Sequence, residues 1–158
     1  MFNAPITPLT PAERRVAEHL VRGLEPRAIA AEARLSANTV SSYIRVMRGK
    51  LHCEPRSALH VLVHRLLSSG QVTPPAAAEP APGLVPGRRA LLRAVAEHTD
   101  AYDVARDALL APADVRAEVD TLLAETGAAD TTQLVVLAHS WGLLGADQQP
   151  SASAGVGG

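Results

Sequence analysis

The segment from residue 36 to residue 56 carries side chains suited to binding a polyanion. Residues 36–51 contain three cations, Arg45, Arg48 and Lys50, and no acid. An arginine can donate two hydrogen bonds to O6 and N7 of guanine, and Lys or Arg beside a phosphate gives salt-dependent affinity. The pattern indicates contact with double-stranded DNA, with candidate contacts at Asn38, Thr39, Ser41, Ser42, Arg45, Arg48, Lys50 and Arg56.

Four short helices are expected to position these side chains. Thr10, Pro11 and Glu13 have the order of a capping box with proline at the first helical position, so a helix begins at Pro11 and stops near Gly23. A second helix starts near Pro26, and a fourth follows Pro55 and runs toward Leu67. The third begins after Ser36, and its apolar stripe leaves the polar and cationic side chains outward. That stripe consists of Val40, Ile44, Met47 and Leu51.

The two middle helices and their short turn have the helix-turn-helix arrangement. Residues 9–70 resemble the LuxR-type (GerE-like) DNA-binding domain in Leu9-Thr10, Glu13, Val16, Gly23, Ile29-Ala30, Leu35-Ser36, Thr39-Val40, Lys50-Leu51 and Arg56. The resemblance implies that the third helix is the recognition helix and that the fourth mediates dimerisation. One departure is Ser41, where the family commonly has Lys. Another is Ser42-Tyr43, which replaces an Asn/Thr-His pair.

A second, more acidic pattern follows 75 residues later. Leu9, Leu35, Val40, Leu59 and His64 recur as Leu84, Leu110, Val115, Leu134 and His139. The charges do not recur, because Arg45 and Lys50 correspond to Asp120 and Glu125. Residues 1–72 hold ten Lys and Arg against five Asp and Glu, whereas residues 73–158 hold five against eleven. We interpret the second pattern as a diverged copy whose acids would repel DNA.

The chain is therefore expected to be all-α, with two tandem four-helix LuxR-type helix-turn-helix domains joined by a Pro/Ala-rich linker. The expected boundaries are a DNA-binding domain at 1–70, a linker at 71–83, a degenerate acidic domain at 84–145 and a disordered tail at 146–158. Aromatic residues make up only 3% of the chain, so the cores should be aliphatic.

The fourth helix of each domain is apolar on more than one face, which suggests a dimer or partner interface. The candidate residues are Leu59, Leu62, Val63, Leu66, Leu134, Leu137 and Trp141. These helices could pair within one chain, which gives a particle with one DNA-binding recognition helix. They could also pair between chains, which gives a dimer with two such helices. The homodimer is favoured, because a particle with a single recognition helix would bind DNA weakly and without palindromy. An exposed Leu123 between acids would suit a protein partner at the second domain, unless it simply broadens the core stripe.

Two functions from different classes remain open. The first is a DNA-binding transcriptional regulator, favoured by the cations of residues 45–50. The second is a protein-interaction adaptor that binds another regulator and little DNA, favoured by Ser41. No nucleotide-binding loop or catalytic group stands out, so no enzyme and no cofactor are expected.

Further residues and the composition exclude other classes. His60 and His64 lack an evident third metal ligand, and the lone Cys53 is expected to be a buried thiol and excludes an internal disulfide. No apolar run reaches the length of a membrane span and no leader opens the chain. A cytoplasmic, nucleoid-associated protein without membrane contact is expected.

Overall fold

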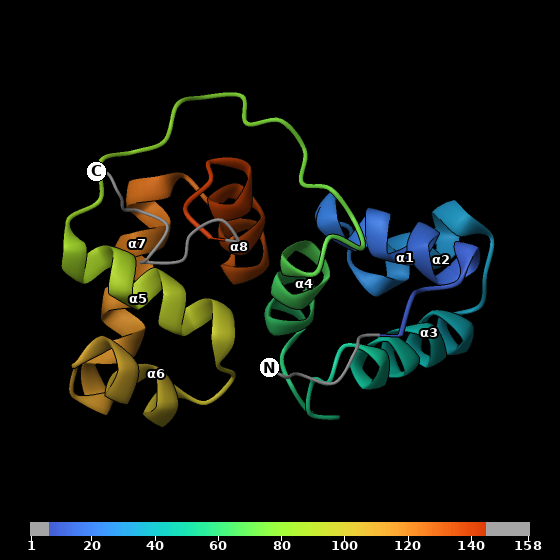
Figure 1. Ribbon diagram of the computed structural model, residues 1–158, viewed down its shortest axis with the longest axis horizontal. Helices are drawn as coiled ribbons and strands as arrows, with labels where there is room; N and C mark the ends of the chain where they lie inside the picture. Colours follow the sequence, from blue (N-terminus) through green and yellow to red (C-terminus); the bar gives the residue numbers. More distant parts are fainter. Residues whose placement is uncertain (1–6, 145–158) are drawn as a thin grey trace.

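The computed structural model of the protein describes residues 7–144 (Figure 1). Within this range the chain forms eight α-helices and one 3-10 turn and contains no strand, which confirms the all-α prediction. None of the described helices is long and apolar enough to cross a membrane. The expected disordered tail at 146–158 lies outside the described residues.

The first unit consists of α1 (Pro11–Val21), α2 (Pro26–Ala33), α3 (Ala37–Lys50) and α4 (Leu59–Ser68). The capping box that opens α1 is present. The Thr10 side chain accepts a hydrogen bond from the Glu13 amide at 3.2 Å, and the Glu13 carboxylate accepts one from the Thr10 amide at 3.0 Å. The fourth helix differs from the sequence expectation, because it begins at Leu59 rather than directly after Pro55.

A tight turn joins α2 to α3. Arg34 ends α2 in the left-handed conformation with φ of 59°, and Ser36 caps α3 by accepting a hydrogen bond from the Thr39 amide at 3.0 Å. Ile29, Val40 and Met47 are fully buried, and α2 and α3 pack on each other and on α1. This is a helix-turn-helix in which the buried stripe of α3 fixes the face that it turns to solvent.

The second unit consists of α5 (Pro86–Glu97), α6 (Ala101–Ala108), α7 (Val115–Thr126) and α8 (Thr131–Ser140), with a 3-10 turn at Pro112–Asp114 before α7. The helices α5 and α6 and the 3-10 turn begin 75 residues after α1, α2 and α3. Left-handed residues recur at the same interval, with Arg34 and His52 matched by Leu109 and Gly127. Helix starts and left-handed residues of the first unit thus recur in the second, although α8 starts three residues early, after its cap Asp130.

The two units pack together through their fourth helices. The helix α4 lies against α8 of the same chain and also contacts α5 (Figure 1). Buried residues of both units form one continuous hydrophobic core. In this structure α4 therefore pairs with α8 of the same chain, which is the alternative that was not favoured from the sequence, and the homodimer stays a prediction. Both alternatives use the same apolar faces, so the sequence pattern alone did not separate them.

The segment between α4 and α5 is non-helical, in line with its proline content, and it lies against the folded units. Val72 is buried at 6% exposure. The carbonyl of Pro75 accepts a hydrogen bond from the Ser140 hydroxyl at 2.6 Å, and that of Glu79 accepts one from the Trp141 indole at 2.8 Å. These bonds fix the segment across the end of α8.

Candidate nucleic-acid interface

The outward face of α3 is polar, cationic and accessible. Asn38, Ser41, Ser42 and Arg45 are all exposed, and no acidic residue occurs in this helix. These four side chains occupy successive turns of one helix whose opposite side is buried. A helix with this face fits the width of a DNA major groove, and hydroxyl, amide and guanidinium groups can all bond to base edges or phosphates.

The other predicted contacts are less free. Thr39 is half-buried and its hydroxyl lies 2.8 Å from that of Ser36, so it supports the start of α3. Arg48 is half-buried, and its Nε is buried without an acceptor among residues 7–144. Arg56 is exposed in the loop between α3 and α4. Arg45 and Arg56 are thus the most accessible of the four predicted cations.

Lys50 serves the fold. Its Nζ lies 2.6 Å from the Glu13 carboxylate, and its side chain is 20% exposed. Burial raises the pKa of Glu13, but hydrogen bonds from Lys50 and Thr10 outweigh burial and hold this pKa below its usual value. The ion pair joins the end of α3 to the start of α1. The sequence interpretation of Lys50 as a free phosphate contact overlooked this pair, because α1 and the end of α3 meet only in the folded unit.

Replacing Lys50 with Met should therefore destabilise the protein. The change leaves the buried Glu13 carboxylate without its cationic partner, and we expect a loss of about 1–3 kcal/mol in the free energy of unfolding at pH 7. Urea denaturation measures the loss. Arg45→Ala is the matched control, since Arg45 is exposed and should change stability by less than about 0.5 kcal/mol. Equal stability of the two variants would contradict the role assigned to Lys50.

Two exposed arginines near the turn were not singled out in the sequence. Arg27 lies in α2, and Arg34 is the left-handed residue directly before the loop to α3. Both stand within the helix-turn-helix and add positive charge to the exposed surface of the first unit. The sequence signal for them was the excess of arginine in residues 1–72.

The corresponding helix of the second unit, α7, carries a different surface. Asp120 and Glu125 are exposed. Glu118 and Glu125 both form ion pairs with Arg88 of α5. The Nε of Arg88 lies 3.3 Å from the Glu125 carboxylate. Leu123 is only partly accessible and packs against the core, so it broadens the core stripe and is not the exposed partner contact that the sequence left open. The outward face of α7 presents acids where α3 presents an arginine.

Most of the predicted interface residues on α4 and α8 are buried. Leu62, Val63, Leu66 and Leu134 have no exposed surface, while Leu59, Leu137 and Trp141 are half-buried. The same pairing brings His64 and His139 together, with Nδ1 of the first 2.9 Å from Nε2 of the second. Burial, with smaller contributions from His139, Arg65 and His60, lowers the pKa of His64 to about 4. Burial likewise lowers the pKa of His139 to about 4.

Cys53 and His60 are also used structurally. Burial raises the pKa of the half-buried Cys53 thiol, against the opposing effect of Arg65 and Arg48. A thiol with a raised pKa is a poor nucleophile and a poor metal ligand at neutral pH. His60 Nε2 lies 3.3 Å from the backbone carbonyl of His98 in the second unit.

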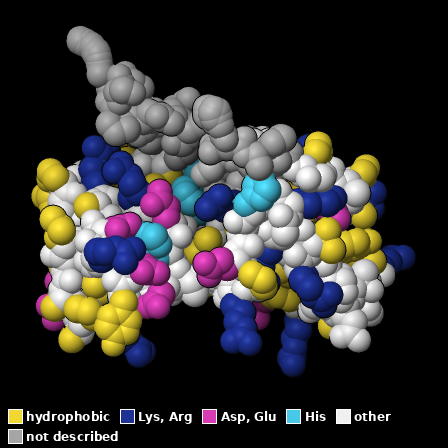
Figure 2. All heavy atoms as spheres, turned by 60° about the horizontal axis from the view of Figure 1, so that its bottom comes forward, with side chains coloured by type: hydrophobic (Ala, Val, Ile, Leu, Met, Phe, Trp, Pro, Cys, Tyr) yellow, Lys and Arg dark blue, Asp and Glu magenta, His cyan; other side chains and the backbone are white. Residues whose placement is uncertain are grey.

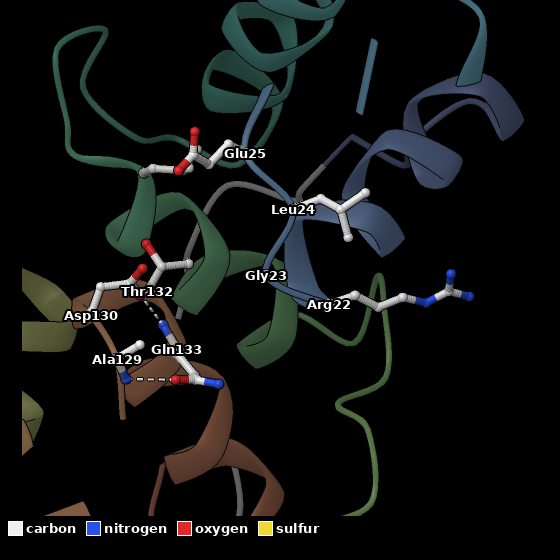
Figure 3. A pocket seen from close by; sticks show the side chains of 9 residues that line it. Arg22, Gly23, Leu24, Glu25, Ala129, Asp130, Thr132 and Gln133 are labelled. Atoms are coloured by element: carbon white, nitrogen blue, oxygen red, sulfur yellow. Dashed lines mark hydrogen bonds between the residues drawn. The ribbon is translucent and has the colours of Figure 1, made fainter. Parts of the chain in front are cut away.

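An open cavity of about 230 Å³ lies between the loop after α1 and the start of α8 (Figure 3). Its polar groups already serve local structure. The Gln133 side-chain oxygen accepts a hydrogen bond from the Ala129 backbone amide at 2.6 Å, and the Gln133 backbone amide donates to the Asp130 carboxylate at 2.8 Å. The Arg22 side chain points away from Asp130 (Figure 3). This cavity therefore offers no convergent set of free functional groups.

Comparison with known proteins agrees with the geometry of the first unit. Residues 7–63 match the family model described as bacterial regulatory proteins, luxR family. The match covers α1 to α3 and the start of α4, just over a third of the chain, and residues 64–144 are not part of it. No curated protein and no solved structure matches the chain. The first unit is thus similar to a family of DNA-binding regulators, and the exposed face of α3 is its candidate reading surface.

Proposed function

We propose that the protein is a DNA-binding transcriptional regulator that places α3 in a major groove and acts on nucleoid DNA in the cytoplasm. The observation that carries this proposal is the exposed, acid-free face of α3 within a helix-turn-helix. Arg45 is the residue assigned to base contact, and Arg56, Arg34 and Arg27 supply nearby positive charge for phosphates. Lys50 contributes by holding α3 on α1.

We further propose that the second unit is a diverged copy of the first, retained for pairing. The recurrence of helix starts and left-handed residues at an interval of 75 supports common descent. Its acids on α7 disfavour a phosphate backbone. In this arrangement the second unit covers α4 and each chain presents a single DNA reader. A particle of 16.5 kDa is expected in light scattering, and a mass twice as large would contradict it.

A DNA-binding titration tests the main proposal. Fluorescence anisotropy with mixed genomic fragments at two salt concentrations should show binding that weakens steeply as salt rises. Arg45→Ala should weaken binding by about 5- to 150-fold, because a bidentate contact contributes about 1–3 kcal/mol. Asp120→Ala, at the corresponding position of α7, is the matched control and should not weaken binding. Salt-insensitive binding, or equal loss in both variants, would contradict the proposal.

The adaptor function remains a second candidate because of one surface. Leu109 is 91% exposed and Tyr102 70% exposed, both beside the acidic residues of the second unit. Large exposed apolar side chains favour protein contact. If the wild-type chain binds no DNA in the titration above, while a pull-down that depends on Leu109 recovers a second regulator, the adaptor is the function.

A further inference from the structure

The ends of α5 and α6 bring together three side chains with metal-binding atoms. Glu97 is the last residue of α5, His98 follows it, and Asp107 lies in the last turn of α6. Their ligand atoms all lie within 4.8 Å of one another. His98 Nε2 is 2.6 Å from one carboxylate oxygen of Asp107. Acidic side chains gather around a histidine on the surface of the second unit, at the left of Figure 2.

We propose that Glu97, His98 and Asp107 bind a divalent transition-metal ion, with Zn²⁺ as the best match to their chemistry. One imidazole nitrogen and two carboxylate oxygens are ligands that Zn²⁺ accepts, and water can fill the remaining coordination positions. Two ligands on a tetrahedral ion with bonds of 2.0–2.1 Å lie about 3.3 Å apart. The hydrogen-bonded pair needs to open by less than 1 Å to admit the ion.

The neighbouring side chains leave one oxygen of Asp107 facing the proposed site. The Asp107 carboxylate faces His98 through Oδ2 at 2.6 Å. Arg106 competes for the same carboxylate, but it faces Oδ1 at 3.6 Å, whereas His98 faces Oδ2. The arginine also pairs with Asp103 at 3.2 Å. The oxygen toward His98 is therefore available to an ion.

The first unit provides an internal comparison. At the positions 75 residues earlier it carries Arg22, Gly23 and Glu32, which include one acid, one cation and no imidazole. The donor set is therefore not a general property of this four-helix arrangement. It belongs to the second unit alone.

The site adjoins the contact between the units. The carbonyl of His98 faces His60 of α4, and the Thr99 hydroxyl accepts a hydrogen bond from the Ala58 amide at 2.8 Å. A cleft of about 330 Å³, lined by Glu97, His98 and residues of the first unit, opens beside it. A bound ion would fix the segment on which α4 rests and so stabilise the docking of the two units.

Isothermal titration of the chelator-treated full chain with Zn²⁺ tests the proposal. We expect one ion per chain, and a loss of affinity of at least about 10- to 100-fold in Asp107→Asn and in His98→Gln, since even outer-shell partners contribute that much. Glu32→Gln, the counterpart of Asp107 in the first unit, should bind like the wild type. Equal affinity in wild type, Asp107→Asn and Glu32→Gln would overturn the proposal.

NMR of the histidine rings gives an independent readout if His98→Gln folds poorly. The ring signals of His98 should change at one equivalent of Zn²⁺, while those of the exposed His52 should not. Changes confined to other histidines would overturn the assignment. Zn²⁺ should also raise the thermal midpoint of the wild type by mass action, but not that of Asp107→Asn. Both measurements are independent of DNA binding.

Discussion

Lowering the pH from 7 to 5 should destabilise the docking of the two units, because His64 and His139 are buried as neutral rings. Their pKa values are lowered to about 4, whereas a histidine in the unfolded chain titrates near 6.5. Below pH 6.5 the unfolded chain binds more protons than the folded one. The histidine contribution is therefore fully present above pH 6.5 and is lost as the pH falls toward 4.

The size of this effect is large for a small protein. Each histidine should remove about 2 kcal/mol from the free energy of unfolding by pH 5, compared with a typical total of about 5–15 kcal/mol. Burial also lowers the pKa of His60, which adds to the loss in the same window. The pKa values of Glu13 and Asp107 are lowered as well. Protonation of these carboxylates therefore reduces the free energy of unfolding only at more acidic pH. Urea midpoints measured from pH 7 to pH 5 report the histidine contribution.

A double variant separates this contribution from the rest of the chain. His64→Gln with His139→Gln retains polar groups at the contact but cannot titrate, so its stability should change much less between pH 7 and pH 5. His52→Asn removes an exposed histidine in a left-handed conformation that Asn tolerates, and it should keep the wild-type profile. A double variant with the full acid sensitivity of the wild type would contradict the assignment.

Local sequence signals predicted the helix starts well. Thr10 and Ser36 each cap a helix, and each cap joins residues three positions apart. The apolar stripe of α3 is likewise a property of one helix, so the outward position of Arg45 followed from it. Helix caps and apolar stripes depend only on residues close together in the sequence, which is why they can be predicted from a single sequence.

Contacts between distant residues were not predictable in the same way. The Lys50–Glu13 pair requires the end of α3 to meet the start of α1. The late start of α4 accompanies a hydrogen bond from the Ala58 amide to Thr99 in the other unit. The 75-residue interval between His64 and His139 was visible in the sequence, but their direct contact depends on pairing within the chain.

A fragment containing residues 1–72 should form a homodimer and bind DNA more tightly than the full chain. Without the second unit, the face of α4 that holds Val61 and His64 loses its cover, since His64 contacts His139 and Val61 lines the cleft shared with His98. The fragment retains α1 to α4 with their own core residues. An uncovered apolar face on a helix that already pairs with a similar helix favours pairing with a second copy.

The tighter DNA binding expected of the fragment follows from the number of recognition helices in each particle. A fragment dimer presents two copies of Arg45, whereas the full chain carries one Arg45, with Asp120 at the corresponding position of α7. Because each neutralised phosphate adds about 0.9 to the slope of log affinity against log salt, the slope should roughly double. Affinity should rise at least tenfold at low salt, since linked sites bind with a high effective concentration. Light scattering and anisotropy titration of the same samples measure both quantities.

A single substitution distinguishes pairing from the loss of acidic repulsion. His64→Asp in the fragment places a charge on the exposed face of α4 and should keep the fragment monomeric. If the tighter DNA binding comes from two recognition helices, this monomer should lose it. If it comes from removal of the acidic α7, the monomer should still bind DNA more tightly than the full chain. A wild-type fragment that is monomeric and binds no better than the full chain would mean that α4 pairs only with α8. The second unit would then be a structural partner that does not limit DNA binding.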